Sequence, residues 1–110
     1  MKENQSEVVK TQMRKGVLEF CIMLIIAKDR AYASDILKEL MRANLLVVEG
    51  TLYPLLSRLR TQGLLEYAWE ESKSGPPRKY YSLTSEGKRN ITQLKETWKE
   101  LSTSINSLIS

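Results

Sequence analysis

The amino-acid sequence predicts a mainly α-helical fold with one small β-hairpin and a long C-terminal helix. Three patterns in the 110 residues support this prediction. Leucines between residues 52 and 59 recur at i, i+3, i+4 and i+7, the spacing of one helix face. Two stretches that alternate apolar and polar residues flank a Gly-Pro-Pro corner at 75–77. Between residues 91 and 108 the apolar positions follow a heptad spacing.

Two helices are expected before the leucine stripe. Segment 16–27 is apolar on almost every side, which predicts a helix that is buried all round and starts near Val8. The apolar run is shorter than the roughly 20 residues that a membrane-spanning helix needs. Cys21 lies within it, and we interpret this cysteine as a small packed hydrophobe rather than a reactive thiol. A second, shorter helix is expected from Ser34, a plausible N-cap, with Asp35 in its first turn. Its apolar residues at helical spacing are Ile36, Leu37, Leu40 and Met41.

The leucine stripe marks a third helix of about three turns. Thr51 is expected to cap it, and Pro54 to fall among the first four N–H positions, where a missing donor costs little. Gly63 is expected to end the helix in the left-handed conformation. The side opposite the leucines is short, polar and hydrogen-bonding, and it carries Gly50, Thr51, Tyr53, Pro54, Ser57, Arg58 and Thr61.

A β-hairpin is expected next. Residues 65–70 alternate apolar and polar side chains, which predicts a half-buried strand, and residues 78–84 are its expected partner, with Tyr81 and Leu83 on one face. Residues 72–77 between them are expected to form the hairpin loop. Tyr80 falls on the face opposite Tyr81.

Thr84 is expected to cap a last helix with an apolar seam. The seam consists of Ile91, Leu94, Trp98, Leu101, Ile105 and Leu108, spaced alternately by three and four residues. It could fold back on its own domain, but the earlier helices already form a small core and leave it without an obvious internal cover. We therefore expect residues 85–110 to be a dimerisation helix, with Leu94, Leu101 and Ile105 in the interface.

The composition excludes much of enzymology. The chain has no histidine and only one cysteine, so the usual zinc sets, a Ser-His-Asp triad and an intrachain disulfide are impossible. We expect no catalytic residues, no cofactor and no metal. The segment before Val17 is polar and does not resemble a secretion signal, so a cytoplasmic protein is expected, with no membrane association. Seventeen Lys and Arg against thirteen Asp and Glu give +4, a weak indication of a polyanionic partner.

The order of the elements is that of a winged helix-turn-helix, a scaffold that places one helix in the major groove of double-stranded DNA. Residues 1–84 would form this DNA-binding domain, including the N-terminal helix. We expect Thr51, Tyr53, Pro54, Ser57 and Arg58 to contact the groove and its phosphates. The alternative is a surface helix whose outward side is merely solvated.

The hairpin tip also has two interpretations. Gly75 to Pro77 could stiffen the tip so that Lys73, Arg78 and Lys79 meet phosphates with little entropy left to lose. Alternatively, these cations only keep the edge strands soluble. Tyr80 could touch the DNA backbone or only cover the sheet. Trp98 on the heptad seam could pack against its own copy in a dimer, or line a cavity at the two-fold axis that clasps a flat aromatic guest.

The chain closely resembles the PadR family of bacterial transcriptional regulators. The resemblance runs through "MRKGVLEFCIMLII", "AYASDILKEL", "EGTLYPLLSRLRTQGLL" and "GPPRKYYSLTSEGK", over most of residues 13–88. It implies a homodimeric winged-helix repressor that binds an inverted-repeat operator and dimerises through its first and last helices. Tyr53 and its neighbours correspond to the recognition helix and residues 75–79 to the wing.

The same resemblance bears on an effector. In the smaller, multidrug-sensing members a tryptophan on the last helix lies at the dimer centre and stacks on planar aromatic compounds, and Trp98 stands in a similar place. The family commonly has a Gly-Tyr-Glu type of stretch at the start of the second helix, where this chain has Ala33, Ser34 and Asp35. Drug-sensing, phenolic-acid-sensing and apparently ligand-free members share these DNA-binding motifs, so the class of effector stays open. A rival hypothesis is a winged-helix adaptor that binds proteins and has no operator of its own.

Overall fold

The computed structural model describes residues 13, 17–45, 47–72 and 74–110. The elements, in chain order, are α2 (Leu18–Lys28), α3 (Ala33–Arg42), α4 (Glu49–Thr61), β1 (Leu65–Ser72), β2 (Gly75–Leu83) and α5 (Ser85–Ile109). The predicted mainly α-helical fold with one hairpin and a long C-terminal helix is confirmed.

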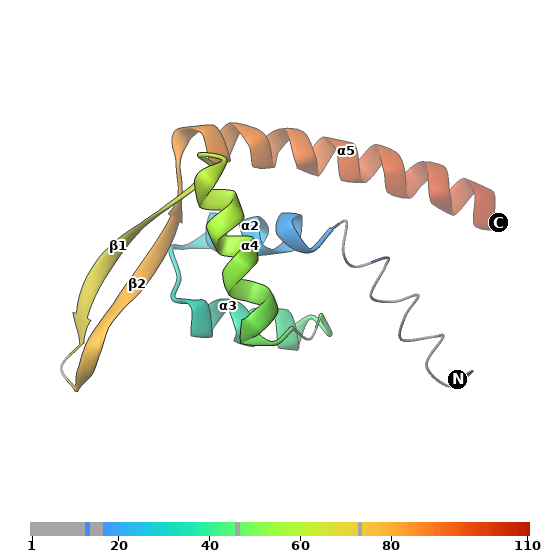
Figure 1. Ribbon diagram of the computed structural model, residues 1–110. Coiled ribbons are helices and arrows are strands. Elements are labelled where there is room, and N and C mark those ends of the chain that lie inside the picture. Colours follow the sequence, from blue (N-terminus) through green and yellow to red (C-terminus); the bar gives the residue numbers. More distant parts are fainter. Residues whose placement is uncertain (1–12, 14–16, 46, 73) are drawn as a thin grey trace.

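Helices α2, α3 and α4 form a helical body, from which the hairpin projects on one side (Figure 1). Helix α5 passes along the body beside α2, and its C-terminal end extends on the side away from the hairpin (Figure 1). The principal-axis extents of 52 × 37 × 23 Å reflect these two projections. One end of the molecule is therefore a two-stranded wing and the other a long helix.

The hydrophobic core joins all six elements. The leucine stripe of α4 faces it as predicted, with Leu52, Leu56 and Leu59 buried and Leu55 half-buried. The side chains that form the rest of the core are Leu18, Ile22, Met23, Ile26, Ala31, Ala33, Ile36, Leu40, Leu65, Tyr81, Leu83 and Ile91. Met41, which was predicted to share the apolar face of α3, is instead 59% exposed.

Helix α2 is not buried all round. One face lies in the core, whereas Phe20, Cys21 and Leu24 on the other face are only half-buried. The physical reason is that α5 covers this side of α2 in part, with the rings of Phe20 and Trp98 6.5 Å apart. The predicted start near Val8 lies outside the described residues; α2 begins at Leu18.

The caps of two helices differ from the prediction. Helix α3 begins at Ala33, and the Asp35 carboxylate accepts a hydrogen bond from the main-chain N–H of Tyr32 at 3.1 Å, so Ser34 is not the N-cap. Helix α4 begins at Glu49 rather than after Thr51, because the Val48 carbonyl already accepts hydrogen bonds from the N–H groups of Thr51 and Leu52.

The earlier start of α4 changes the position of Pro54. It becomes the sixth helical residue, beyond the first turn where a missing donor is free of cost. The Gly50 carbonyl then has no helical N–H partner, but Gly50 is exposed and water can bind this oxygen. Gly63, just after the helix, has φ +79° and ends it in the left-handed conformation, as predicted.

The hairpin is antiparallel, with Leu65 opposite Leu83, Tyr67 opposite Tyr81 and Glu70 opposite Arg78. The strands run further than expected, so residues 75–77 belong to β2 and not to the predicted loop 72–77. Two prolines are tolerated there because the ladder is irregular between Glu70 and Ser72, where no regular pairing needs their missing N–H groups. Lys73 lies outside the described residues.

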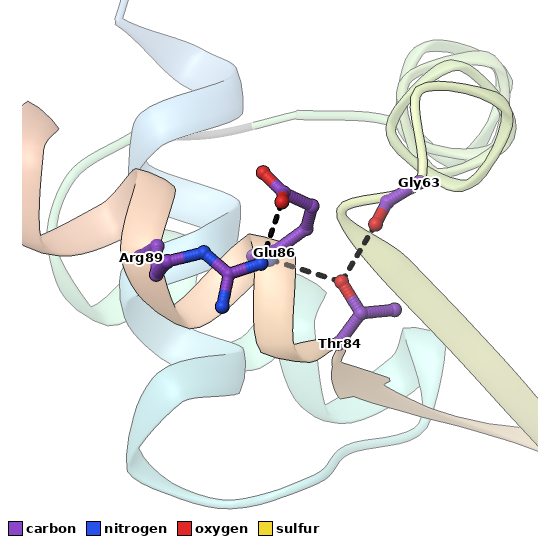
Figure 2. Close-up of polar contacts among 5 residues, drawn as sticks. Gly63, Thr84, Glu86 and Arg89 are labelled. Carbon is purple, nitrogen blue, oxygen red and sulfur yellow. Dashed lines mark hydrogen bonds and ion pairs between the residues drawn. The ribbon is translucent and has the colours of Figure 1, made fainter.

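Figure 2 shows the junction between the hairpin and α5. The Thr84 hydroxyl accepts a hydrogen bond from the N–H of Gly87 at 2.9 Å, which confirms it as the N-cap of α5. It also donates to the Gly63 carbonyl at 2.6 Å and so ties α5 to the end of α4 (Figure 2). A Cβ at Gly87 would collide with the carbonyl of Leu64, so only glycine permits this close approach.

Two kinds of feature are absent from the described residues: a membrane-spanning helix and a cluster of metal-binding side chains. Among the residues that the structure describes, none of the helices combines the length and apolar character needed to traverse a bilayer. Within the same residues, no three His, Cys, Asp or Glu side chains gather in a way that could hold a metal ion.

Candidate nucleic-acid interface

The outward side of α4 forms a polar surface. All of its predicted contact residues are exposed: Thr51, Tyr53, Pro54, Ser57 and Arg58. The Tyr53 ring is 48% exposed, although it is a large side chain that usually packs. The Thr61 hydroxyl donates to the Ser57 carbonyl at 2.9 Å, so the far end of this surface is tied to the helix backbone. A rigid helix anchored by leucines therefore presents hydroxyl groups and one aromatic ring.

Arg58 differs from its neighbours on this surface. Its guanidinium lies 3.6 Å from the Glu19 carboxylate of α2, and the Arg58 side chain is 64% exposed. An ion pair this exposed contributes little to stability. The pair holds Arg58 at the rim of the polar surface, from which its guanidinium can exchange the carboxylate for another anion.

The two wing cations lie on opposite faces of the hairpin, each against aromatic rings. The guanidinium carbon of Arg78 is 3.9 Å from the centre of the Tyr32 ring. The Lys79 ammonium lies 4.4 Å from the Tyr67 ring centre and 5.5 Å from that of Trp69. Cation–π contacts of this kind restrict a charged side chain without removing its hydrogen-bond donors. Both cations are thus preorganised, and both can still bind an anion.

A hollow of about 370 Å³ separates the wing from α4. It brings Tyr53 of α4 together with Arg78 and Lys79 of β2, which are far apart in sequence. The N-terminal residues Ala33 and Ser34 of α3 also line it. Helix α4, the start of α3 and the wing therefore border one concave surface that carries two cations.

Sequence reasoning missed three residues beside the wing, Arg30, Tyr32 and Glu70, and it left the role of Tyr80 open. The Tyr32 and Tyr80 rings stack with their centres 4.4 Å apart, and the Arg30 guanidinium lies 4.6 Å from the Tyr80 ring centre. Burial, and then a hydrogen bond to the Glu70 carboxylate, raises the pKa of Tyr32, so its hydroxyl stays protonated and donates at 3.2 Å. The only local signal was alternation, which placed Tyr80 opposite Tyr81; Tyr32 comes from a distant loop.

The heptad seam of α5 lies elsewhere on the molecule. Beyond the buried Ile91 the seam is more exposed: Leu94 is half-buried, and Trp98, Leu101 and Ile105 are 46%, 50% and 45% exposed. An apolar groove of about 620 Å³ runs between this helix and α2. Its lining residues are Val17, Phe20, Cys21, Leu24, Leu45, Lys95, Glu96, Trp98 and Lys99. Burial raises the pKa of the Cys21 thiol, which agrees with its interpretation as a packed hydrophobe.

The geometry of α3, α4 and the wing defines a winged helix-turn-helix transcriptional regulator. The second helix of the pair shows a polar face to solvent, and the hairpin flanks it with cations. The comparison with known families agrees with this class. Residues 22–93 match the transcriptional regulator PadR-like family, and the chain belongs to this family. Its members are regulators of transcription and not enzymes.

Solved structures support the assignment. A PadR-like transcription factor from Bacteroides fragilis is 57% identical, with a TM-score of 0.78 over 91% of this chain and 97% of that one. A PadR-like transcriptional regulator from Bacillus cereus is 38% identical, with a TM-score of 0.80 over 90% and 97% of the two chains. A PadR family regulator from Eggerthella lenta is 29% identical, with a TM-score of 0.88 over 99% and 96%.

Proposed function

We propose that the protein is a cytoplasmic, homodimeric transcriptional repressor that binds an inverted-repeat operator through α4 and the wing. The observation that carries this proposal is the concave surface where Tyr53 of α4 meets Arg78 and Lys79 of the wing. A duplex offers base edges in its major groove to a helix and phosphates to flanking cations. Thr51, Tyr53, Pro54, Ser57 and Arg58 are the proposed groove contacts, and Lys73, Arg78 and Lys79 the proposed phosphate contacts.

The dimer rests on the apolar seam of α5. Leu108 and Ile109 are 86% and 77% exposed, in continuity with Trp98, Leu101 and Ile105. A contiguous apolar surface of this kind on a small domain indicates a protein interface. A second copy of the same helix supplies a matching seam, and a two-fold dimer then places two α4 helices on two half-sites. Domain 1–84 would bind DNA while residues 85–110 hold the pair together.

The apolar groove between α2 and α5 supports an effector site. Its walls are almost entirely apolar, and Phe20 and Trp98 offer two aromatic faces. Lys95, Glu96 and Lys99 lie at its border and could orient a polar or charged substituent. We propose that a planar aromatic compound binds Trp98 in the dimer and releases the operator.

A gel shift tests DNA binding and separates it from the adaptor function. The protein is titrated against DNA from upstream of its own gene and against a shuffled duplex of equal length. The proposal predicts a complex with the upstream DNA at concentrations at least about 1000-fold below those that bind shuffled DNA. Equal, weak binding to both duplexes would instead favour a winged-helix adaptor that binds proteins.

Tryptophan fluorescence tests the effector site. In a Trp69→Phe background Trp98 is the only tryptophan, so tryptophan emission reports on it alone. Flat aromatic cations are titrated, and saturable quenching that accompanies loss of the operator complex would support the proposal. A repressor without a ligand site is indicated if a broad panel leaves the emission unchanged.

A further inference from the structure

Apart from the continuous chain at its two ends, the wing is joined to the helical body by one pair of main-chain hydrogen bonds within the described residues. Ala31, in the connection between α2 and α3, donates to the Tyr81 carbonyl at 2.9 Å and accepts from its N–H at 2.8 Å. No main-chain hydrogen bond between described residues joins 75–80 of β2 to the helices. The half of the wing that carries Arg78 therefore depends on side-chain contacts for its position.

The Ala31 connection aligns Tyr32 with the preceding residue of β2, Tyr80. From this alignment a stack of four side chains is built, in the order Arg78, Tyr32, Tyr80, Arg30. Successive separations are 3.9 Å from the Arg78 guanidinium to the Tyr32 ring, 4.4 Å between the two rings and 4.6 Å from Tyr80 to the Arg30 guanidinium. The rings are 22° from parallel, which is close to a stacked arrangement. The stack connects the α2–α3 loop with the outer part of the wing.

A hydrogen bond reinforces the stack. The Tyr32 hydroxyl donates to the Glu70 carboxylate at 3.2 Å, and Glu70 is the cross-strand partner of Arg78. Tyr32 therefore contacts both strands of the wing at the same level, Arg78 through its ring face and Glu70 through its hydroxyl. A single residue at the start of α3 fixes both strands.

The geometry suits a cation that must bind phosphate. A guanidinium held over the face of a ring, as Arg78 is over Tyr32, keeps N–H donors that can bind an anion. The ring removes rotamer freedom before DNA arrives, so the entropy cost of binding is smaller. Tyr80 is next to Tyr32 in the stack, on the side away from Arg78, and its ring supports the Tyr32 ring.

We infer that Tyr32, at the start of α3, and Tyr80, on β2, are positioning residues for the DNA-contacting Arg78. This inference rests on the proposed DNA-binding function. It assigns the Tyr80 ring to the support of the wing rather than to contact with the DNA backbone. Glu70 orients Tyr32 through their hydrogen bond. Arg30 packs on the Tyr80 ring at the end of the stack that lies away from Arg78.

The first experiment needs no DNA. Backbone order parameters of Arg78 and Lys79 are measured by NMR relaxation in the free protein and in the variants Tyr32→Leu and Tyr32→Phe. In the natural protein and in Tyr32→Phe, which keeps the ring, values near about 0.8 are expected; in Tyr32→Leu they should fall below about 0.6. The Asp35 cap bonds the main chain of residue 32, so Tyr32→Leu retains it and α3 should stay folded. Unchanged order in Tyr32→Leu would overturn the inference, whatever the protein binds.

The second experiment measures coupling to Arg78 in a double-mutant cycle on operator affinity. Tyr32→Leu alone should weaken binding about fivefold, and it should have no further effect in an Arg78→Ala background. Trp69→Leu is the matched control, because Trp69 lies on the opposite face of the wing and contacts Lys79. It should act independently of Arg78. Equal weakening by Tyr32→Leu with and without Arg78 would contradict a positioning role.

The two experiments separate this inference from the proposed function. If the natural protein binds no DNA, the function fails, but the order parameters still report whether Tyr32 holds the wing. If Arg78→Ala weakens DNA binding while Tyr32→Leu does not, the function stands and the positioning role fails.

Discussion

The wing and the outer half of α5 are both projections from one small core, and they expose opposite kinds of surface. The wing and α4 expose mainly hydroxyls and cations, together with the rings of Tyr53 and Trp69. The α5 seam exposes apolar side chains, with Leu101 at 50% and Leu108 at 86%. The hydrophobic effect opposes the second arrangement but not the first. A mainly polar surface can stay exposed to water before it binds a ligand, whereas an apolar seam such as that of α5 favours burial against the proposed second copy.

The largest effect is expected from a charge in the α5 seam. Leu101→Lys would bury an unpaired ammonium group in the proposed dimer interface, and the dimer dissociation constant should rise at least about 100-fold. Sedimentation equilibrium measures this change. Leu101 is half exposed in the single chain, so the monomer should stay folded.

Thr103→Lys is the matched control for this substitution. It adds the same charge to α5, but Thr103 lies off the seam and is exposed. The two variants should differ widely in self-association. If the seam does not form the dimer, both variants should change the dimer dissociation constant by the same small amount.

A smaller effect, of about tenfold, is expected from Arg78→Ala on DNA affinity. Binding to every sequence should weaken, and the dependence of log K on log salt should flatten by about 0.9 for each phosphate that the variant no longer neutralises. Fluorescence anisotropy at several salt concentrations measures both. Lys88→Ala removes one positive charge from α5 at the base of the hairpin, at the other end of β2 from Arg78, and should leave the slope unchanged. An unaltered slope in Arg78→Ala would contradict the wing assignment.

Substitutions on α4 should change preference more than strength. Ser57→Ala or Tyr53→Ala is expected to alter the ranking of operator variants by about 1–3 kcal/mol at one position, because base contacts specify sequence while phosphate contacts do not. Competition binding with a set of single-base operator variants measures the ranking. Equal weakening on operator and random DNA would show that α4 is not the element that recognises sequence.

The smallest effect concerns Cys21 on the covered side of α2. Burial raises the pKa of its thiol, so the reactive thiolate should form only at higher pH than in the unfolded chain. Because the folded pKa lies above the unfolded one, the thiol's contribution to stability is present below the unfolded pKa and is lost as pH rises through the folded pKa. Iodoacetamide labelling from about pH 7 to 10 should be slower with folded protein than in urea. Equal rates in both would show that the groove leaves the thiol open.

Much of the fold followed from local patterns in the sequence. The leucine stripe predicted the buried face of α4, and the left-handed Gly63 and the Thr84 cap were both confirmed. Helix starts were less accurate, because the Val48 carbonyl opens α4 before Thr51. A main-chain acceptor leaves no signature in the side-chain pattern, whereas a capping hydroxyl does.

The surroundings of the wing could not be predicted in the same way. The alternating pattern placed Arg78 and Lys79 on the hairpin. The Gly-Pro-Pro segment suggested that a stiff loop held them. In the structure, residues 75–77 belong to β2, and aromatic rings hold the cations. Tyr32 reaches the wing only because the Ala31 connection brings a loop between two helices beside β2. Such a contact depends on tertiary structure, and a single sequence carries no local trace of it.

We propose that a polar surface on each chain binds DNA while an apolar seam joins two chains. Sedimentation velocity of the protein with a labelled duplex from upstream of its own gene tests both halves at once. We expect two chains on each duplex, and Leu101→Lys should not form that complex at the same concentration. A complex with one chain per duplex, or one that forms equally well on shuffled DNA, would contradict it.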